Sequence, residues 1–258
     1  MAGILAGKKI LILGVANKRS IAWATAQAAV REGASLCLTY QGERMKEGVL
    51  ELAATLPGTL TAPCDATDEA SLKALFDMLK DKWNRLDGLV HSIAFAPAAD
   101  LEKPFVETSR DGFRIAADVS AYTLVALCRH ARPLFEVAGG GSVTAFTYLG
   151  SERAVPGYNV MGAAKAALEA SVRYLASDLG ALKIRVNAVS PGPLNTLSAR
   201  GVSGFSKILD VVKDRAPLRR NIEASEVADT TVFLLSEMAR GITGELIHVD
   251  AGFHCMGI

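Results

Sequence analysis

A tyrosine and a lysine, Tyr158 and Lys165, are the residues of this sequence whose types and spacing best suit chemistry. They lie at the start of an Ala-rich stretch that predicts a helix, and another tyrosine, Tyr148, precedes them across a loop with proline and glycine. Seven helical residues turn by about 700°, close to two full turns, and rise by about 10 Å. If the helix begins at or just before Tyr158, both side chains can point into one cleft, where a phenol and an ammonium suit proton donation and cofactor binding. The pair could equally be two solvent-facing residues that share a helix, so the spacing alone leaves both interpretations open.

Short apolar strands that alternate with helices are expected to position this pair. Strands are expected at 9–13, 35–40, 59–63, 86–91, 142–147, 185–189 and 246–249. Helices are expected at 21–30, 43–56, 68–84, in two segments within 108–136, at 159–179 and at 225–236, with a loop over 191–206. Continuous apolar strands between helices indicate a parallel sheet that is buried on both faces. We therefore expect an α/β fold, a single Rossmann-like doubly wound parallel sheet of about seven strands with helices on both faces, in one domain over residues 1–258.

The composition limits the classes of partner and compartment. Half of the 258 residues are apolar and the net charge is +1, so the chain can bury a large core but lacks the charge typical of nucleic-acid or anionic-membrane binding. No run of 18 apolar residues predicts a membrane span. The N-terminus carries its charge after a short apolar run, the reverse order of a secretory signal. The four cysteines show no CxxC spacing, so we expect reduced thiols and a reducing compartment.

Several strand ends carry residues that suit a dinucleotide. In an open parallel sheet the ligand binds beyond the carboxyl ends of the strands, and a helix N-terminus there can bind a pyrophosphate. The first such turn begins at Gly14 and leads to Ser20, a predicted N-cap, but it lacks the GxGxxG fingerprint and could be a plain strand-to-helix turn. Gln41 ends the second strand where an NAD site usually has a carboxylate, and Asp65, at the third, could bind adenine or be only a turn residue. Small residues over 91–96 permit the close approach of a flat ring.

These features occur within a wider set of stretches that resemble one protein family over essentially the whole chain. The stretches are Gly14 with Ser20-Ile21-Ala22, Thr39-Tyr40-Gln41, 91–97, 148–153, 158–162, 185–188, Gly192-Pro193 and 241–245. Together they resemble the short-chain dehydrogenase/reductases and, more narrowly, the enoyl-acyl-carrier-protein reductases of bacterial fatty-acid elongation.

Two departures from the ordinary members of that superfamily favour the narrower resemblance. Ordinary members have lysine four residues after the tyrosine, whereas here that position is Gly162 and lysine follows at seven, as in enoyl reductases. Ordinary members also have a catalytic serine about a dozen residues before the tyrosine, where this chain has Ala145 and Phe146. Physically, an enoyl thioester takes hydride at C3 while charge develops on the thioester oxygen two carbons away. A longer Tyr–Lys spacing is one way to place the donor further from the nicotinamide.

The resemblance implies a role for each candidate residue. Tyr158 is implied to stabilise the enolate, Lys165 to hold the nicotinamide ribose, and Tyr148 to line the acyl pocket, although an aromatic that merely closes a strand would look the same. The implied cofactor-binding residues are Gly14, Ser20, Ile21, Gln41, Asp65, Ala66, Ile93, Lys165, Leu194, Asn195, Thr196, Leu197 and Ser198. The implied substrate-binding residues are Ala96, Tyr148 and Tyr158. A substrate-binding lid is implied near 194–215.

The same resemblance implies NADH as cofactor, because Thr39-Tyr40-Gln41 matches the NADH-using form. NADPH is less expected, although Gln41 leaves no carboxylate to repel a 2′-phosphate and Lys18, Arg19 and Arg44 lie close in sequence. An enoyl thioester bound to acyl-carrier protein is the implied substrate, the cytoplasm the implied compartment and a homotetramer the implied assembly.

Two other functions are less expected, and no metal site is expected. A 3-ketoacyl or alcohol-type reductase of the same superfamily is disfavoured by the missing serine and the longer spacing. A non-catalytic dinucleotide-binding sensor is disfavoured because Tyr148, Tyr158 and Lys165 occur together. No metal is expected, because the histidines lack ligand spacing. They are His91, His130, His248 and His254.

Overall fold

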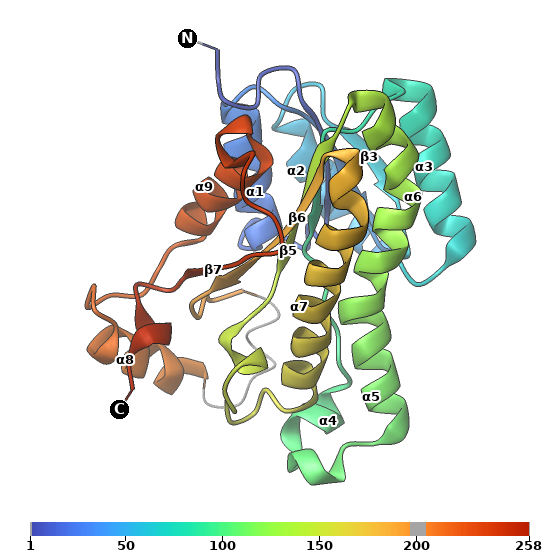
Figure 1. Ribbon diagram of the computed structural model, residues 1–258. Helices are drawn as coiled ribbons and strands as arrows, with labels where there is room; N and C mark the ends of the chain where they lie inside the picture. Colours follow the sequence, from blue (N-terminus) through green and yellow to red (C-terminus); the bar gives the residue numbers. More distant parts are fainter. Residues whose placement is uncertain (1, 197–204, 258) are drawn as a thin grey trace.

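Seven parallel strands form one sheet in the computed structural model, which describes residues 2–196 and 205–257 (Figure 1). The strands are β1 (Lys9–Leu13), β2 (Ser35–Tyr40), β3 (Leu60–Pro63), β4 (Gly88–His91), β5 (Gly141–Phe146), β6 (Ile184–Pro191) and β7 (Leu246–Val249). Their order is β3-β2-β1-β4-β5-β6-β7, and every neighbouring pair is parallel. This arrangement confirms the Rossmann-like α/β fold.

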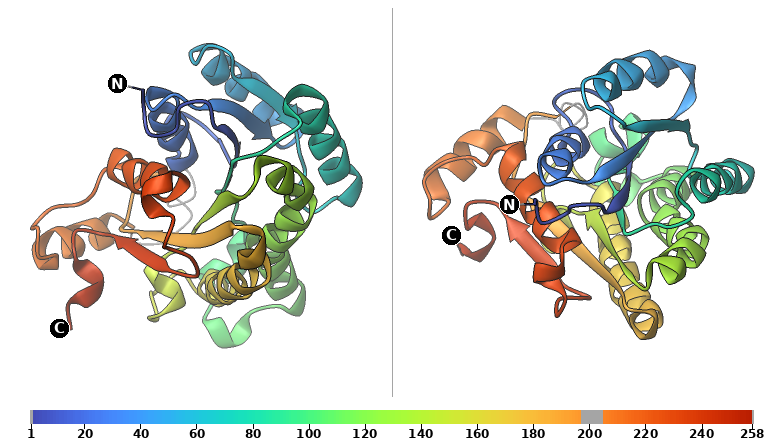
Figure 2. Two further views of the ribbon diagram at one scale, coloured as in Figure 1. Left: turned by 45° about the horizontal axis from the view of Figure 1, so that its top comes forward. Right: turned by 90° about the horizontal axis from the view of Figure 1, so that it is seen from above.

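Helices cover both faces of the sheet and bury its apolar side chains. They are α1 (Ile21–Arg31), α2 (Gly42–Ala54), α3 (Glu69–Trp83), α4 (Ala98–Glu102), α5 (Arg110–Ala117), α6 (Thr123–Ala138), α7 (Val160–Leu179), α8 (Phe205–Arg215) and α9 (Ala224–Leu235). One core cluster joins the sheet to α3, α6 and α7, and the other joins it to α1, α2 and α9. Figures 1 and 2 show these two layers of helices on opposite sides of the strands.

The strand order reverses at β1, which pairs with β2 on one side and β4 on the other. In doubly wound sheets the ligand crevice lies at such a switch point. Leu13, His91 and Ala145 are level with one another in the sheet, so the turns that follow β1, β4 and β5 begin at one edge. Figure 1 shows that α4 and the amino end of α7 lie beyond this edge. The fold therefore gathers the candidate residues at one end of the sheet.

The strand predictions are largely confirmed, and so is the start of α1. The bounds of β1, β2 and β7 are those expected, and the other strands differ by one or two residues at one or both ends. Ser20 caps α1 as predicted, with its side chain accepting a hydrogen bond from the backbone of Trp23.

The helices differ from the predictions at three places. The long helix α7 begins at Val160, one residue after the expected start, so Tyr158 lies just outside it. The region 108–136 holds α5 and α6 joined without a break by a π-helical turn, Asp118–Tyr122, and α4 before it was not expected. The second half of the expected lid is helical, because α8 covers Phe205–Arg215.

None of the helices within the described part of the chain is long and apolar enough to span a membrane. Over residues 2–196 and 205–257, the structure holds no group of three or more His, Cys, Asp or Glu side chains suited to a metal ion.

Candidate active site

The two candidate tyrosines meet ring to ring at the end of β5. Tyr148 follows this strand, and Tyr158 lies in the turn before α7. Their ring centroids are 4.9 Å apart with an interplanar angle of 65°, an edge-to-face contact. Two glycines make room for it. A Cβ on Gly150 would lie 2.3 Å from the Tyr158 ring, and a Cβ on Gly162 would lie 2.5 Å from the backbone oxygen of Gly150.

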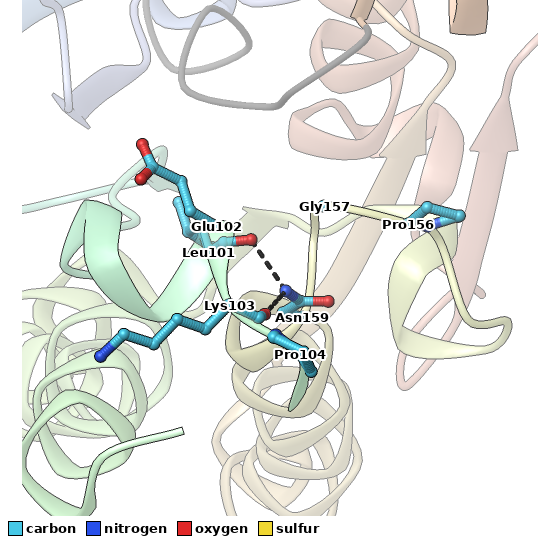
Figure 3. A pocket seen from close by; sticks show the side chains of 7 residues that line it. All are labelled: Leu101, Glu102, Lys103, Pro104, Pro156, Gly157 and Asn159. Carbon is cyan, nitrogen blue, oxygen red and sulfur yellow. Dashed lines mark hydrogen bonds between the residues drawn. The ribbon is translucent and has the colours of Figure 1, made fainter. Parts of the chain in front are cut away.

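Tyr158 is positioned by a tight turn and not by helical spacing. The next residue, Asn159, has φ 40° and ψ −119°, a conformation that costs a non-glycine residue about 1–3 kcal/mol. Its side-chain amide donates hydrogen bonds to the backbone oxygens of Leu101 (2.8 Å) and Lys103 (2.6 Å), which link the turn to the carboxyl end of α4 (Figure 3). The condition under which helical spacing would direct Tyr158 and Lys165 into one cleft is therefore not met, because the helix begins only after this strained residue.

Lys165 is buried on α7 and reaches back to β5. Its side chain is 5% exposed, and Nζ donates a hydrogen bond of 2.7 Å to the backbone oxygen of Phe146. Burial lowers the pKa of Lys165 to about 8, and the charge of Glu169 opposes that shift. An ammonium with this pKa is mostly charged at neutral pH, so Lys165 can act there as a hydrogen-bond donor.

Both phenols remain protonated at neutral pH. Burial raises the pKa of Tyr148 and, more strongly, that of Tyr158, whose shift is increased by Tyr148 and Glu169. A protonated phenol in a desolvated site is a strong neutral donor toward an oxygen on which negative charge develops. His91, at the end of β4, is neutral, because burial and then Lys165 lower its pKa to about 3. Lys165 and, four residues after it on α7, Glu169 are thus the ionisable groups of opposite sign nearest to the tyrosine pair on this helix.

The expected pyrophosphate turn has the geometry of a backbone cradle. Gly14 has φ 88°, and a Cβ there would lie 1.9 Å from the backbone oxygen of Ser92, so only glycine fits. The turn leads to α1, whose first amides are free to point at an anion. The Ser20 hydroxyl is occupied locally, since it lies 2.8 Å from the backbone oxygen of Asn17 while it caps α1.

The two expected adenosine residues lie in contact with each other. Gln41 Nε2 donates a hydrogen bond of 3.0 Å to Asp65 Oδ2, which brings the ends of β2 and β3 together. The hydroxyl of Thr67 is the main cause that lowers the pKa of Asp65, so this carboxylate stays ionised as an acceptor. Gly14, α1 and this pair fit the phosphate and adenosine parts of a dinucleotide.

Comparison with known proteins decides the family. The sequence pattern of the family described as Enoyl-(Acyl carrier protein) reductase matches residues 14–254. The chain belongs to this family. It is 52% identical to the enoyl-acyl-carrier-protein reductase (NADH) FabI of Bacillus cereus over 256 residues, covering 98% of this chain and 99% of that protein. It is 45% identical to FabI of Escherichia coli over 252 residues, covering 97% and 95%.

Solved structures of this reductase family have the same fold. The Bacillus cereus enoyl-acyl carrier protein reductase, solved with NADP+ and an indole naphthyridinone, superposes with a TM-score of 0.97 at 51% identity, covering 99% of this chain and all of that one. The enzyme of Anaplasma phagocytophilum, solved in complex with NAD, gives a TM-score of 0.96 at 44% identity, covering 100% of this chain and 98% of that one.

The remaining reductase-site predictions divide into three groups. Ala96 is buried in a small apolar cluster with Val160 and Met161, against which Tyr158 packs, so it lies beside the tyrosine pair. Others lie elsewhere along the same edge or in the core: Ile21, Ala66, Ile93, Leu194, Asn195 and Thr196. Leu197 and Ser198 lie outside the described residues.

Several residues of the site were missed from the sequence. Asn159 and Glu169 carry polar contacts in the turn and on α7. Gly150 provides the space for the Tyr158 ring, and Gly162 provides the space for the backbone of Gly150. The glycines could have been found from their places on either side of the tyrosine, whereas the partners of Asn159 are more than 50 residues away in sequence. A pocket of about 410 Å³ opens beside this turn, between the segment 101–104 and the residues Pro156, Gly157 and Asn159 (Figure 3).

Proposed function

We propose that this chain reduces the trans-2 double bond of enoyl-acyl-carrier-protein thioesters in fatty-acid elongation. The observation that carries the proposal is the edge-to-face pair of protonated tyrosines beside a buried lysine at the switch edge of the sheet. NADH is the cofactor and supplies the hydride that is added at C3 when it is bound. The family and its relatives named for NADH support this reaction and this cofactor.

Tyr158 is proposed as the residue that stabilises the enolate. Its phenol stays protonated, because burial raises its pKa, and so it donates a hydrogen bond to the thioester oxygen as charge develops there. One such preorganised donor is worth about 100- to 1,000-fold in kcat. The contact with Tyr148 restrains the ring, which keeps the phenol directed along one line.

Lys165 is proposed to hold the ribose hydroxyls of the cofactor. Its Nζ has three hydrogens and gives one to Phe146 O, which leaves donors for a ligand. The same positive charge favours negative charge on a nearby substrate oxygen.

Tyr148 and Ala96 are proposed to line the acyl pocket. Tyr148 is partly buried and its ring packs against that of Tyr158, while Ala96 belongs to the apolar cluster against which Tyr158 packs. Leu101 packs on the same cluster and extends the apolar surface toward the pocket of Figure 3. An acyl chain suits this surface because it is apolar and unbranched.

The cofactor is proposed to lie along the turns after β1 to β4. Gly14, Ser20 and Ile21 are the proposed pyrophosphate residues, and Gln41, Asp65 and Ala66 the proposed adenosine residues. Ile93 is proposed to face the nicotinamide, and residues 194–198 to close over the cofactor as part of a lid that spans 194–215. The fit of Gly14 and of the Gln41–Asp65 pair supports this placement.

The alcohol-type alternative lacks a hydroxyl where its serine would be. Ala145 and Phe146 hold those positions and are 0% and 6% exposed, so neither offers a polar group to a ketone. We also propose a homotetramer and a cytoplasmic location, as the resemblance implies. The four cysteines are free thiols, which suits a reducing compartment.

Absorbance at the NADH band tests the proposal directly. A trans-2-enoyl thioester and a 3-ketoacyl thioester are each supplied with NADH and, separately, with NADPH. Turnover of the enoyl thioester with NADH is expected. Turnover of the ketoacyl thioester alone would refute the assignment, and comparison of the KM values for NADH and NADPH fixes the cofactor.

A further inference from the structure

Glu169 is a buried carboxylate that the proposed chemistry does not use. It lies on α7 four residues after Lys165 and is 8% exposed. Ionised carboxylates are rarely buried unless hydrogen bonds or charges compensate for the lost water. Its contacts therefore indicate what this charge does.

The carboxylate of Glu169 holds both ends of the stretch that carries Tyr148. Oε1 accepts hydrogen bonds of 2.5 Å from the hydroxyls of Thr147 and Ser151, the residues that flank 148–150. The Ser151 hydroxyl also lies 2.9 Å from the backbone oxygen of Tyr148, so its one hydrogen serves either acceptor. Through these two hydroxyls, Glu169 links the segment 148–150 to α7. This segment contains Tyr148 and also Gly150, against which the Tyr158 ring packs.

The charge of Glu169 also acts on Lys165. From α7, Glu169 raises the pKa of Lys165 against the opposing effect of burial. From β4, His91 is neutral, and its Nε2 lies 2.8 Å from the hydroxyl of Thr123. From the turn and the end of β5, the tyrosines are protonated and the backbone oxygen of Phe146 accepts from Nζ. Among these neighbours, Glu169 is therefore the group that raises the pKa of Lys165 and so favours its ammonium form.

We propose that Glu169 is a positioning residue of the reductase site, which fixes Tyr148 and the Gly150 contact of Tyr158 through two hydroxyls and supports Lys165, one helical turn away on α7, in cofactor binding. This inference rests on the proposed function for its effect on turnover. Its effect on NADH binding stands independently of the substrate.

Two sets of variants separate the two roles. Glu169→Gln keeps an oxygen acceptor and removes the charge. The loss of NADH affinity at alkaline pH, here called the alkaline limb, should therefore move to lower pH. Thr147→Val with Ser151→Ala keeps the charge and removes both hydroxyls, so kcat should fall about 10- to 100-fold, the effect of a misplacement of up to about 1 Å, while the limb stays in place. Asp178→Asn, which removes an exposed carboxylate from the same helix, is the matched control and should change neither.

NADH binding is measured by fluorescence titration from pH 6 to 10, and turnover by absorbance with a trans-2-enoyl thioester. An unmoved limb in Glu169→Gln, or wild-type kcat in the double variant, would overturn the proposal. If Glu169→Gln does not fold, Glu169→Asp decides, because it keeps the charge but shortens the reach; wild-type kcat in that variant counts against the proposal. A wild-type chain that binds NADH but does not reduce the enoyl thioester refutes the proposed function alone.

Discussion

Replacement of Gly150 by alanine tests whether the position of the Tyr158 ring controls the reaction. A Cβ at this position would lie 2.3 Å from Cδ1 and 2.8 Å from Cε1 of the ring, whereas ordinary contact begins at 3.4 Å. Gly150 does not have a positive φ, so alanine adds no backbone strain and its effect comes from the ring alone. The ring must retreat by about 1 Å, a displacement that can lower a rate by about 100-fold.

We therefore expect Gly150→Ala to lower kcat by about 100-fold while the KM for NADH changes little. The assay is NADH oxidation at saturating enoyl thioester, with NADH binding measured separately by fluorescence. Gly48→Ala is a matched control, because a Cβ on this helical glycine meets nothing within 4 Å. It should leave kcat unchanged and stabilise α2 by about 0.5–1 kcal/mol. A Gly150→Ala enzyme with wild-type kcat would show that the ring can shift without consequence and would refute the reasoning.

Four further predictions follow from the same geometry. Tyr158→Phe should lower kcat by about 100-fold or more, with the KM for NADH nearly unchanged, since it removes one donor; full activity would exclude the assigned role. The pKa of Lys165, about 8 against 10.5 for an ordinary lysine, predicts that kcat/KM for NADH falls above about pH 8. Between about pH 8 and pH 10.5 the unfolded chain binds more protons at Lys165 than the folded chain, so the contribution of Lys165 to the free energy of unfolding should rise across this range. A Lys165→Met enzyme should lack the fall in kcat/KM above about pH 8. Asn159→Asp should cost about 2 kcal/mol or more in urea unfolding, because its oxygens would face two backbone oxygens. Asn159→Gly, which also relieves the backbone strain, should cost less, and the reverse order would contradict the account of this turn. Gln41→Glu should raise the KM for NADPH relative to that for NADH, because it places a second carboxylate beside Asp65; an unchanged ratio would remove Gln41 from the adenosine site.

The sheet could be predicted from the sequence because its strands are short apolar runs that end at residues which stop a strand. Gly14 ends β1, and the apolar run of β2 ends at Tyr40, just before the first residues of α2. The N-cap Ser20 was readable for the same reason, since a capping hydroxyl acts within three residues of itself. The bounds of these strands and the start of α1 are therefore determined by residues that are close in sequence.

The start of α7 was predicted to within one residue, but the conformation of Asn159 could not be predicted because its cause is not local. Ala-rich sequence favours a helix that includes Asn159, but the side chain of Asn159 binds backbone oxygens of Leu101 and Lys103. That tertiary contact holds the backbone in a conformation no helix permits. The helix α8 was missed for a different reason, since it follows a stretch rich in Gly and Ser that favours a loop. The division into one domain and the extent of the lid stay predictions.

The seven-residue spacing between Tyr158 and Lys165 acquires a structural meaning that differs from the helical one. The first two of those residues form a turn, so the helix contributes only the part from Val160 to Lys165. The turn directs Tyr158 toward Tyr148, while the helix directs Lys165 toward the end of β5. The two functional groups are therefore held by different elements, and the glycines beside the turn allow those elements to approach. With the lysine in the same place, a spacing of four residues would put the tyrosine at position 161, inside α7, so the longer spacing is what lets a turn rather than the helix position Tyr158.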